Sequence, residues 1–205
     1  MLKSKFFRYV ALILFLVGLS LIGKATYIHA KAGLAKYLLR SSWQETIEKG
    51  DNVKPWAWAD TWPVARMLIP EHEIDLVVLE GDSGSVLAFG PGHMTLSSLP
   101  GQPGNSIISG HRDTSFRFLK RVSVGDRIIM QTREGIMVPF KVIATQIIDK
   151  AILDMNIEAD IPLLTLVTCY PFDAVVPGGA QRYLVFAEYD AEGTAGISIN
   201  GVPLS

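Results

Sequence analysis

The chain has a single cysteine among its 205 residues, so no disulfide can form within it. It also has almost no net charge, because 19 Lys and Arg residues stand against 20 Asp and Glu residues. This balance, without a basic stripe interleaved with aromatic residues, argues against a nucleic acid partner. One cysteine and four scattered histidines supply no cluster of converging metal ligands. We therefore expect neither a metal nor a cofactor.

Long hydrophobic runs are also few, and the longest lies at the N-terminus. Basic residues lead into residues 9–23, a run of roughly 15 residues that two preceding phenylalanines extend toward the ~20 needed to cross a bilayer. We predict a retained single-pass anchor in the inner (plasma) membrane over residues 1–25. A cleaved secretory signal peptide is the alternative. Either interpretation places the rest of the chain outside the cytoplasm.

Residues 26–70 are predicted to form a juxtamembrane helix followed by a connector. Apolar residues at three- and four-residue steps from Ile28 to Trp43 mark one stripe of a helix that could run to Lys49 and stop at Gly50. The prolines that follow discourage long regular elements. The tryptophans of the connector either pack on the outside of the domain or form a membrane-interface belt, and we favour packing.

The remainder of the chain is predicted to be all-β. Short segments rich in β-branched and aromatic residues are separated by Gly, Pro, Asp and Asn, as in a barrel or sandwich. Single helical turns are expected at residues 115–122 and 155–162, and the tail at 191–205 carries little signal. The expected strands cover residues 75–80, 86–89, 106–109, 127–133, 136–148, 163–168 and 183–189.

The lone cysteine, Cys169, closes the apolar run of residues 163–169. A cysteine at a strand end is a candidate nucleophile, which needs a histidine and an orienting group elsewhere in the chain. A free cysteine also often only fills core volume. Position alone leaves both alternatives open.

Two of the four histidines are candidates for the base. His29 and His72 are most simply surface residues, whereas His93 lies in a turn-like segment and His111 ends a predicted strand. Reacting side chains at the ends of rigid strands are held at hydrogen-bonding distance more readily than side chains in turns. This favours His111 over His93.

An arginine could complete the set. If the strands on either side of residues 171–180 are antiparallel neighbours, Arg182 begins its strand near the point where Cys169 ends its own. A guanidinium there could favour a thiolate or hold the oxygen that becomes negative when a carbonyl is attacked. Arg112, beside the favoured histidine, is a rival for this role. A surface cation is the simpler alternative for Arg182.

Three segments resemble the signature motifs of the sortases, which are membrane-anchored cysteine transpeptidases with a β-barrel catalytic domain. They are the run Thr165–Cys169 (TLVTC), the strand end Gly110–His111 and the strand start at Arg182. The resemblance covers most of the chain after about Leu76, including residues 99–105 (LPGQPGN). It implies a closed barrel of about eight strands with one or two short helices over residues 71–190.

By this resemblance, Cys169 is the nucleophile, His111 the general acid and base, and Arg182 the group that stabilises the oxyanion. The stretch from Tyr170 to Tyr183 looks closest to the sortases of Gram-negative bacteria, which would place the catalytic domain in the periplasm. The implied partner is a secreted protein whose C-terminal sorting signal resembles Leu-Pro-Xaa-Thr-Gly, followed by an apolar anchor. The amine that accepts its acyl group is not identified.

The walls of a substrate groove are predicted from proximity to the cysteine alone. Thr168, Tyr170 and Phe172 are the candidates, with core packing as the alternative for the aromatic residues. Two other functions stay open for the chain. A cysteine peptidase would use the same groups and release its substrate to water, and a membrane-tethered barrel without enzymatic activity would leave the thiol inert.

Overall fold

The computed structural model describes residues 2–152, 157–176, 178–193, 198–199 and 202–203. It contains two compact units, Met1–Leu38 and Leu39–Ser205. Helix α1 (Leu2–Lys49) forms the first unit and continues into the second. Over its described part it is long and apolar enough to cross a membrane. The helix ends where the sequence predicts, because Gly50 adopts a left-handed conformation (φ 74°) that suits glycine.

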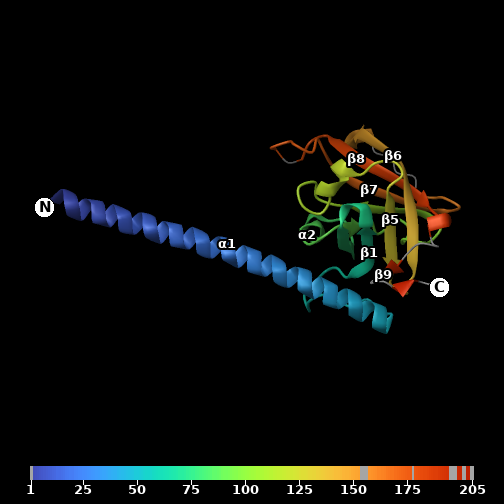
Figure 1. Cartoon of the computed structure of the whole chain (residues 1–205), viewed down its shortest axis with the longest axis horizontal. Helices are drawn as coiled ribbons and strands as arrows, with labels where there is room; N and C mark the ends of the chain where they lie inside the picture. The colour runs from blue at the N-terminus through green and yellow to red at the C-terminus, as the bar shows by residue number, and fades with distance from the viewer. Residues whose placement is uncertain (1, 153–156, 177, 194–197, 200–201, 204–205) are drawn as a thin grey trace. The chain divides into compact units, whose positions relative to one another are not determined.

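The second unit is a closed β-barrel, which confirms the predicted fold class (Figure 1). The strand order around the barrel is β1-β2-β3-β4-β7-β8-β6-β5. The strands are β1 (Pro63–Ile69), β2 (Ile74–Glu80), β3 (Gly92–His93), β4 (Gly104–Ser109), β5 (Arg127–Thr132), β6 (Met137–Asp149), β7 (Pro162–Tyr170) and β8 (Gln181–Tyr189). The short helices are η1 (Pro70–His72), α2 (Gly84–Leu87), η2 (Arg117–Arg121) and η3 (Lys150–Ile152), and a separate two-stranded sheet pairs β9 (Ser198–Ile199) with β10 (Val202–Pro203).

Side chains that alternate along the strands fill the interior of the barrel. Strand β1 buries every second side chain completely, with Ala65, Met67 and Ile69 pointing inward, as expected from the two-residue period of a strand. The described core residues are mainly aliphatic and aromatic and come from all the longer strands and from η2. They include Met67, Val78, Ile108, Phe116, Leu119, Ile128, Met130, Phe140, Leu164, Leu166 and Val185.

The last turns of α1 pack on the barrel. Leu39 is 4% exposed and contacts Leu79 and Val86, and Trp43 is 3% exposed with its indole N–H directed at the side-chain oxygen of Gln131. This part of the predicted apolar stripe is therefore a packing surface of the second unit.

The connector tryptophans differ in exposure, since Trp56 and Trp62 are half-buried and Trp58 is exposed. The Trp56 ring lies 4.9 Å from that of Phe89, in an edge-to-face arrangement. Trp58 is 82% exposed. Trp56 therefore packs on the domain as predicted, whereas the Trp58 side chain is largely exposed to solvent.

Two predicted segments differ from the structure. Residues 63–69 form a barrel strand although the sequence predicts an irregular connector there, because Pro63 and Pro70 lie at and just beyond the strand ends, where proline is tolerated. The predicted strand at residues 86–89 is wrong. A one-turn helix (α2) occupies this region and presents Val86 to Leu79, since so short an apolar run does not distinguish a strand from a helical turn.

Of the two expected helical turns, the first is confirmed as η2, with Phe116 and Leu119 completely buried at and within it. The second, at residues 155–162, begins outside the described residues. Its described part contains no helix before β7 starts at Pro162.

An ion pair between β1 and β2 gives the barrel a pH-dependent contribution to stability. Arg66 donates two hydrogen bonds to the Asp75 carboxylate, at 2.8 and 2.9 Å. These hydrogen bonds, more than the other charges nearby, hold the pKa of Asp75 below its usual value. Because the folded-state pKa is the lower one, this contribution is complete above the unfolded pKa and is lost as the pH falls through the folded pKa.

We expect Asp75→Asn to lower the thermal unfolding midpoint by about 1–2 °C at neutral pH, since partly exposed pairs contribute little. The difference from the parent should shrink as the pH falls below about 4. Circular dichroism of both proteins in detergent across this pH range measures it. A difference that persists undiminished at strongly acidic pH contradicts the assignment.

Candidate active site

Three adjacent strands bring the predicted catalytic residues to one end of the sheet. Strand β7 pairs in parallel with β4 and antiparallel with β8. Ser109 lies opposite Val167, so the chain beyond β4 reaches His111 at the level of Cys169. On the other side, Cys169 is the direct register partner of Arg182. The antiparallel pairing on which the interpretation of Arg182 depends is therefore present.

The Cys169 and Arg182 side chains also lie on the same face of the sheet. Leu164 and Leu166 point into the barrel core, so the alternating positions that end at Cys169 lie on the outer face of β7. Val167 on that face packs with Leu184 of β8. Directly opposed residues of an antiparallel pair share a face, and the Cys169 and Arg182 side chains thus project from the same outer surface.

The backbone that carries His111 is fixed tightly to β7. The Thr168 hydroxyl donates to the carbonyl of Gly110 at 2.7 Å, and the Gly110 N–H donates to the carbonyl of Val167 at 3.0 Å. Phe116, which is fully buried, closes the turn by donating its N–H to the carbonyl of His111 at 2.9 Å. The imidazole itself is on an exposed residue.

Glycine is required immediately before that histidine. A Cβ atom at Gly110 would lie 2.6 Å from Cγ of Phe116. Since this is the root of a buried ring and not the end of a flexible chain, a larger residue must displace either the ring or the His111 backbone.

Arg182 is held by one nitrogen and keeps others available. Its Nη1 donates to the carbonyls of Gly179 and Gln181 at 2.8 and 2.9 Å. Within the described part of the chain, neither Nε nor Nη2 of Arg182 donates a hydrogen bond. The guanidinium is oriented by the loop and retains donors for a ligand.

Arg112 has the opposite character. It is only 6% exposed, and its Nε and Nη2 donate to both carboxylate oxygens of Asp113 at 2.8 and 2.9 Å. Its Nη1 donates to the carbonyl of Pro171 at 2.6 Å, and Nη2 also donates to that of Ala174 at 2.8 Å. The pKa of Arg112 is raised, chiefly by the Asp113 carboxylate and to a lesser degree by Cys169. Arg112 therefore fastens the β7–β8 loop beside the thiol, and these hydrogen bonds use four of its five N–H donors.

The predicted groove residues face away from the cysteine. Tyr170 lies one position beyond Cys169 and thus on the other face of β7, with its ring 5.9 Å from that of Phe172 and 6.3 Å from that of Tyr183. Phe172 and Tyr183 pack against the barrel core. Thr168 is 2% exposed and bonded to Gly110. This arrangement favours the packing alternative, and a substrate-binding role for the three stays a prediction.

The other three histidines lie in different surroundings. His93 is 2% exposed, with Nε2 3.0 Å from the Ser98 carbonyl and 3.1 Å from the Ser97 hydroxyl. His72 is not simply solvated, because its Nε2 lies 2.8 Å from an Asp126 carboxylate oxygen. His29 is exposed on α1. Among the described residues, no group of three or more His, Cys, Asp or Glu side chains could hold a metal ion.

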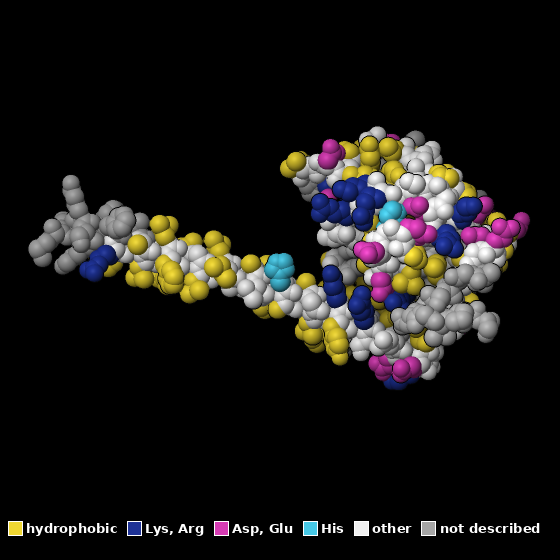
Figure 2. Space-filling model, viewed as in Figure 1, with side chains coloured by type: hydrophobic (Ala, Val, Ile, Leu, Met, Phe, Trp, Pro, Cys, Tyr) yellow, Lys and Arg dark blue, Asp and Glu magenta, His cyan; other side chains and the backbone are white. Residues whose placement is uncertain are grey.

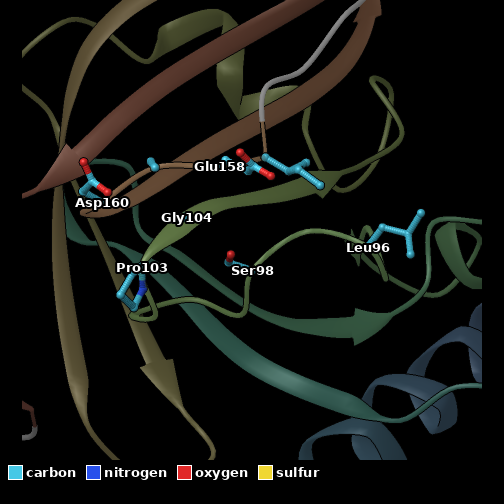
Figure 3. Close-up of a pocket in the computed structure, with 8 residues that line it drawn as sticks. Leu96, Ser98, Pro103, Gly104, Glu158 and Asp160 are labelled. Carbon is cyan, nitrogen blue, oxygen red and sulfur yellow. The ribbon is translucent and has the colours of Figure 1, made fainter.

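A separate shallow pocket of about 560 Å³ lies at the starts of β4 and β7, the ends remote from Cys169 (Figure 3). Leu96 and Ser98 border it on one side, and Glu158 and Asp160 border it on the other. Cys169 lies seven residues along β7 from Pro162, about 23 Å of strand, so this pocket does not include the reacting groups.

Comparison with known proteins identifies relatives of the barrel. The family model "Sortase domain" matches residues 67–190. Sortase D of Bacillus subtilis is 32% identical over 123 residues, 58% of this chain and 60% of that protein. The chain thus spans less than two thirds of that relative's length.

Solved structures share the fold. A Clostridium perfringens sortase D5 transpeptidase superposes with a TM-score of 0.63 at 23% identity, over 77% of this chain and 99% of the other. Sortase C-1 of Actinomyces oris superposes with a TM-score of 0.56 at 28% identity, over 62% and 72%.

We expect Gly110→Ala to abolish catalysis by displacing His111, while Gly84→Ala, where a Cβ would contact nothing within 4 Å, leaves it unchanged. Transfer of the acyl part of a peptide resembling Leu-Pro-Xaa-Thr-Gly to Cys169, followed by protein mass and compared at matched circular dichroism, measures the effect. Parent-like activity of Gly110→Ala in a folded protein contradicts the account of this turn.

Proposed function

The chain belongs to the sortase family, and from this premise we propose that it is a membrane-anchored cysteine transpeptidase. Its Cys169 would cleave a C-terminal sorting signal through a thioester and pass the acyl group to an amine. The observation that carries the proposal is the register of three strands, which pairs Cys169 with Arg182 and sets His111 at the adjacent strand end.

The first half-reaction forms the thioester. The Cys169 thiolate attacks the carbonyl carbon of the scissile peptide bond, and a tetrahedral oxyanion results. Collapse of this intermediate breaks the C–N bond, and the His111 imidazolium gives its proton to the departing amine. The exposed position of His111 lets it reach a substrate that lies across the outer face of β7.

Arg182 is the better of the two candidate oxyanion donors. The Arg112 guanidinium is committed to Asp113 and to two loop carbonyls, whereas Arg182 keeps Nε and Nη2 for a ligand. Arg182 also projects from the same strand face as the thiol. A preoriented cationic donor at that place stabilises the charge that develops on the carbonyl oxygen.

The second half-reaction regenerates the enzyme. An incoming amine, deprotonated by His111, attacks the thioester carbonyl, and the new C–N bond releases the Cys169 thiolate. If water takes the place of the amine, the outcome is hydrolysis, which is the alternative function of the same site.

The finer assignments are part of the same proposal. The catalytic residues are proposed to lie in a domain over residues 71–190, extended by β1, and α1 is proposed to anchor it with the barrel outside the cytoplasm. We assign the chain to the subgroup found in Gram-negative bacteria because of the stretch from Tyr170 to Tyr183. The substrate is proposed to be a secreted protein with a signal resembling Leu-Pro-Xaa-Thr-Gly.

The decisive test is capture of the thioester. A peptide carrying such a signal, incubated with the full chain in detergent, should increase the protein mass by that of the acyl part, on Cys169. Cys169→Ala should show no adduct, and hydroxylamine should remove the adduct from the parent. A thiol that remains unmodified with every sorting peptide, and resists mild alkylation, would instead support the inert barrel.

Substitution of Arg182 and substitution of Arg112 are predicted to have different effects on acylation and on stability. Arg182→Ala should slow acylation about 10²–10³-fold, as expected when an oxyanion donor is lost, and should lower the unfolding midpoint less than Arg112→Ala does, since its two loop carbonyls lie nearer to water. Arg112→Ala should lower the midpoint, because Asp113 and two carbonyls lose their partner. Rapid-quench kinetics and thermal unfolding of both variants separate the roles, and an inverted pattern would exchange them.

Transpeptidation and hydrolysis differ in their products. With a primary amine such as triglycine added, we expect the parent to yield the peptide joined to the amine. A product that is only the free acid at high amine concentration supports the peptidase alternative. His111→Ala serves as the control, since it should depress both products together.

A further inference from the structure

The loop between β7 and β8 carries two fully apolar side chains that the protein does not cover. Val175 is 96% exposed and Val176 is 75% exposed. The loop begins directly after the strand that bears Cys169, so this valine tip stands beside the proposed active site. Two adjacent exposed valines at one place signal a contact surface more strongly than scattered apolar residues do.

The base of this loop is fastened to the barrel by hydrogen bonds and ring contacts, up to the residue before the exposed tip. Arg112 donates to the carbonyls of Pro171 and Ala174 on the approach to the valines. Phe172 stacks edge-to-face on Tyr183, with ring centroids 5.1 Å apart, and packs against the barrel core. The chain is thus held up to the residue before Val175.

Basic side chains accompany the valine tip. The helix η2 buries Phe118 and Leu119 and leaves Arg117, Lys120 and Arg121 exposed. Arg112 joins this segment to the loop, since it belongs to the turn before η2 and holds both loop carbonyls. Figure 2 shows Lys and Arg side chains gathered next to the apolar loop tip. The acidic residues of this region are Asp113, which is paired with Arg112, and the exposed Asp173.

We propose that the valine tip and the basic face of η2 together form a contact surface for a bilayer that contains anionic lipids. Apolar side chains flanked by Lys and Arg suit the boundary between acyl chains and headgroups. Each basic residue near an anionic surface adds about a fivefold gain in affinity. The same chain carries a helix long and apolar enough to cross a membrane, which supplies the bilayer.

The proposed function explains why such a contact would be useful, and this part of the inference rests on that function. A sorting signal followed by an apolar anchor has its scissile bond close to the lipid. A catalytic barrel whose Cys169 side rests on the bilayer meets that bond without drawing the substrate out of the membrane.

The test places a fluorescent reporter at the tip. In the full chain carrying Cys169→Ala, the new thiol of Val175→Cys is labelled with an environment-sensitive dye, and the protein is reconstituted in vesicles of phosphatidylcholine with phosphatidylglycerol. We expect blue-shifted emission and strong quenching by lipids that carry a doxyl group near the headgroup. Leu96→Cys is the matched control, because Leu96 is 83% exposed and borders the pocket that contains Glu158 and Asp160 (Figure 3).

Removing the charge should remove the contact. Lys120→Glu combined with Arg121→Glu should reduce lipid quenching at position 175 to the value at position 96, as should vesicles of phosphatidylcholine alone. Equal quenching at positions 96 and 175 in anionic vesicles overturns the proposal. A blue shift without lipid quenching also overturns it, since that result indicates a second copy or another protein on the surface.

Activity assays separate this inference from the function beneath it. Val175→Ser with Val176→Ser should leave adduct formation with a soluble sorting peptide unchanged, and should lower the processing of a membrane-embedded substrate about tenfold. Unchanged processing of the embedded substrate rejects the contact surface alone. Failure of the parent to form any adduct rejects the proposed function, whatever the dye at position 175 reports.

Discussion

The whole site depends on strand β7 and its two different neighbours. A parallel partner (β4) and an antiparallel partner (β8) bring a strand end and a strand start to the same edge of the sheet. Cys169 ends the central strand, and the histidine and arginine arrive from either side. A one-residue slip of either pairing would turn the corresponding side chain to the opposite face. Registry between these three strands is thus the condition that the proposed chemistry requires first.

Burial explains why two nearby arginines differ. A guanidinium removed from water must find partners for its donors, because an unpaired buried charge is very costly. Arg112 meets this demand with Asp113 and two loop carbonyls, and so becomes a structural element that joins the chain after β4 to the loop after β7. Arg182, which is less buried, needs fewer internal partners. The same side-chain type is left with donors only where water or a ligand can supply the acceptors.

The sequence predicts secondary structure that depends on neighbouring residues, but it does not predict contacts between residues far apart in the chain. The strands with long β-branched runs, such as β7 and β8, are predictable, as is the end of α1 at Gly50. Strand β1 is missed because its two prolines suggest a connector, although both lie at positions where a strand tolerates them. At the site, strand ends point to Cys169 and His111.

The supporting contacts could not be read from the sequence, since they join residues far apart in the chain. Arg112 reaches across 59 and 62 residues to the loop carbonyls, and Thr168 reaches 58 residues to Gly110. The groove candidates illustrate the converse limit, because adjacency to Cys169 in the sequence suggests a shared surface. Alternation along the strand instead turns Tyr170 to the other face. Position in the sequence suggests candidate reactive residues here, and the topology decides which neighbours face them.

The β7–β8 loop combines a fixed base with an uncovered apolar end, and these two properties are linked. An apolar pair on a slack loop could fold back onto the barrel and bury itself, as most exposed hydrophobic side chains would gain by doing. Here the guanidinium of Arg112 and the aromatic contacts of Phe172 hold the loop before Val175. The structure that orders the active-site side of the barrel therefore also keeps the valines outward, so both features depend on the same few contacts.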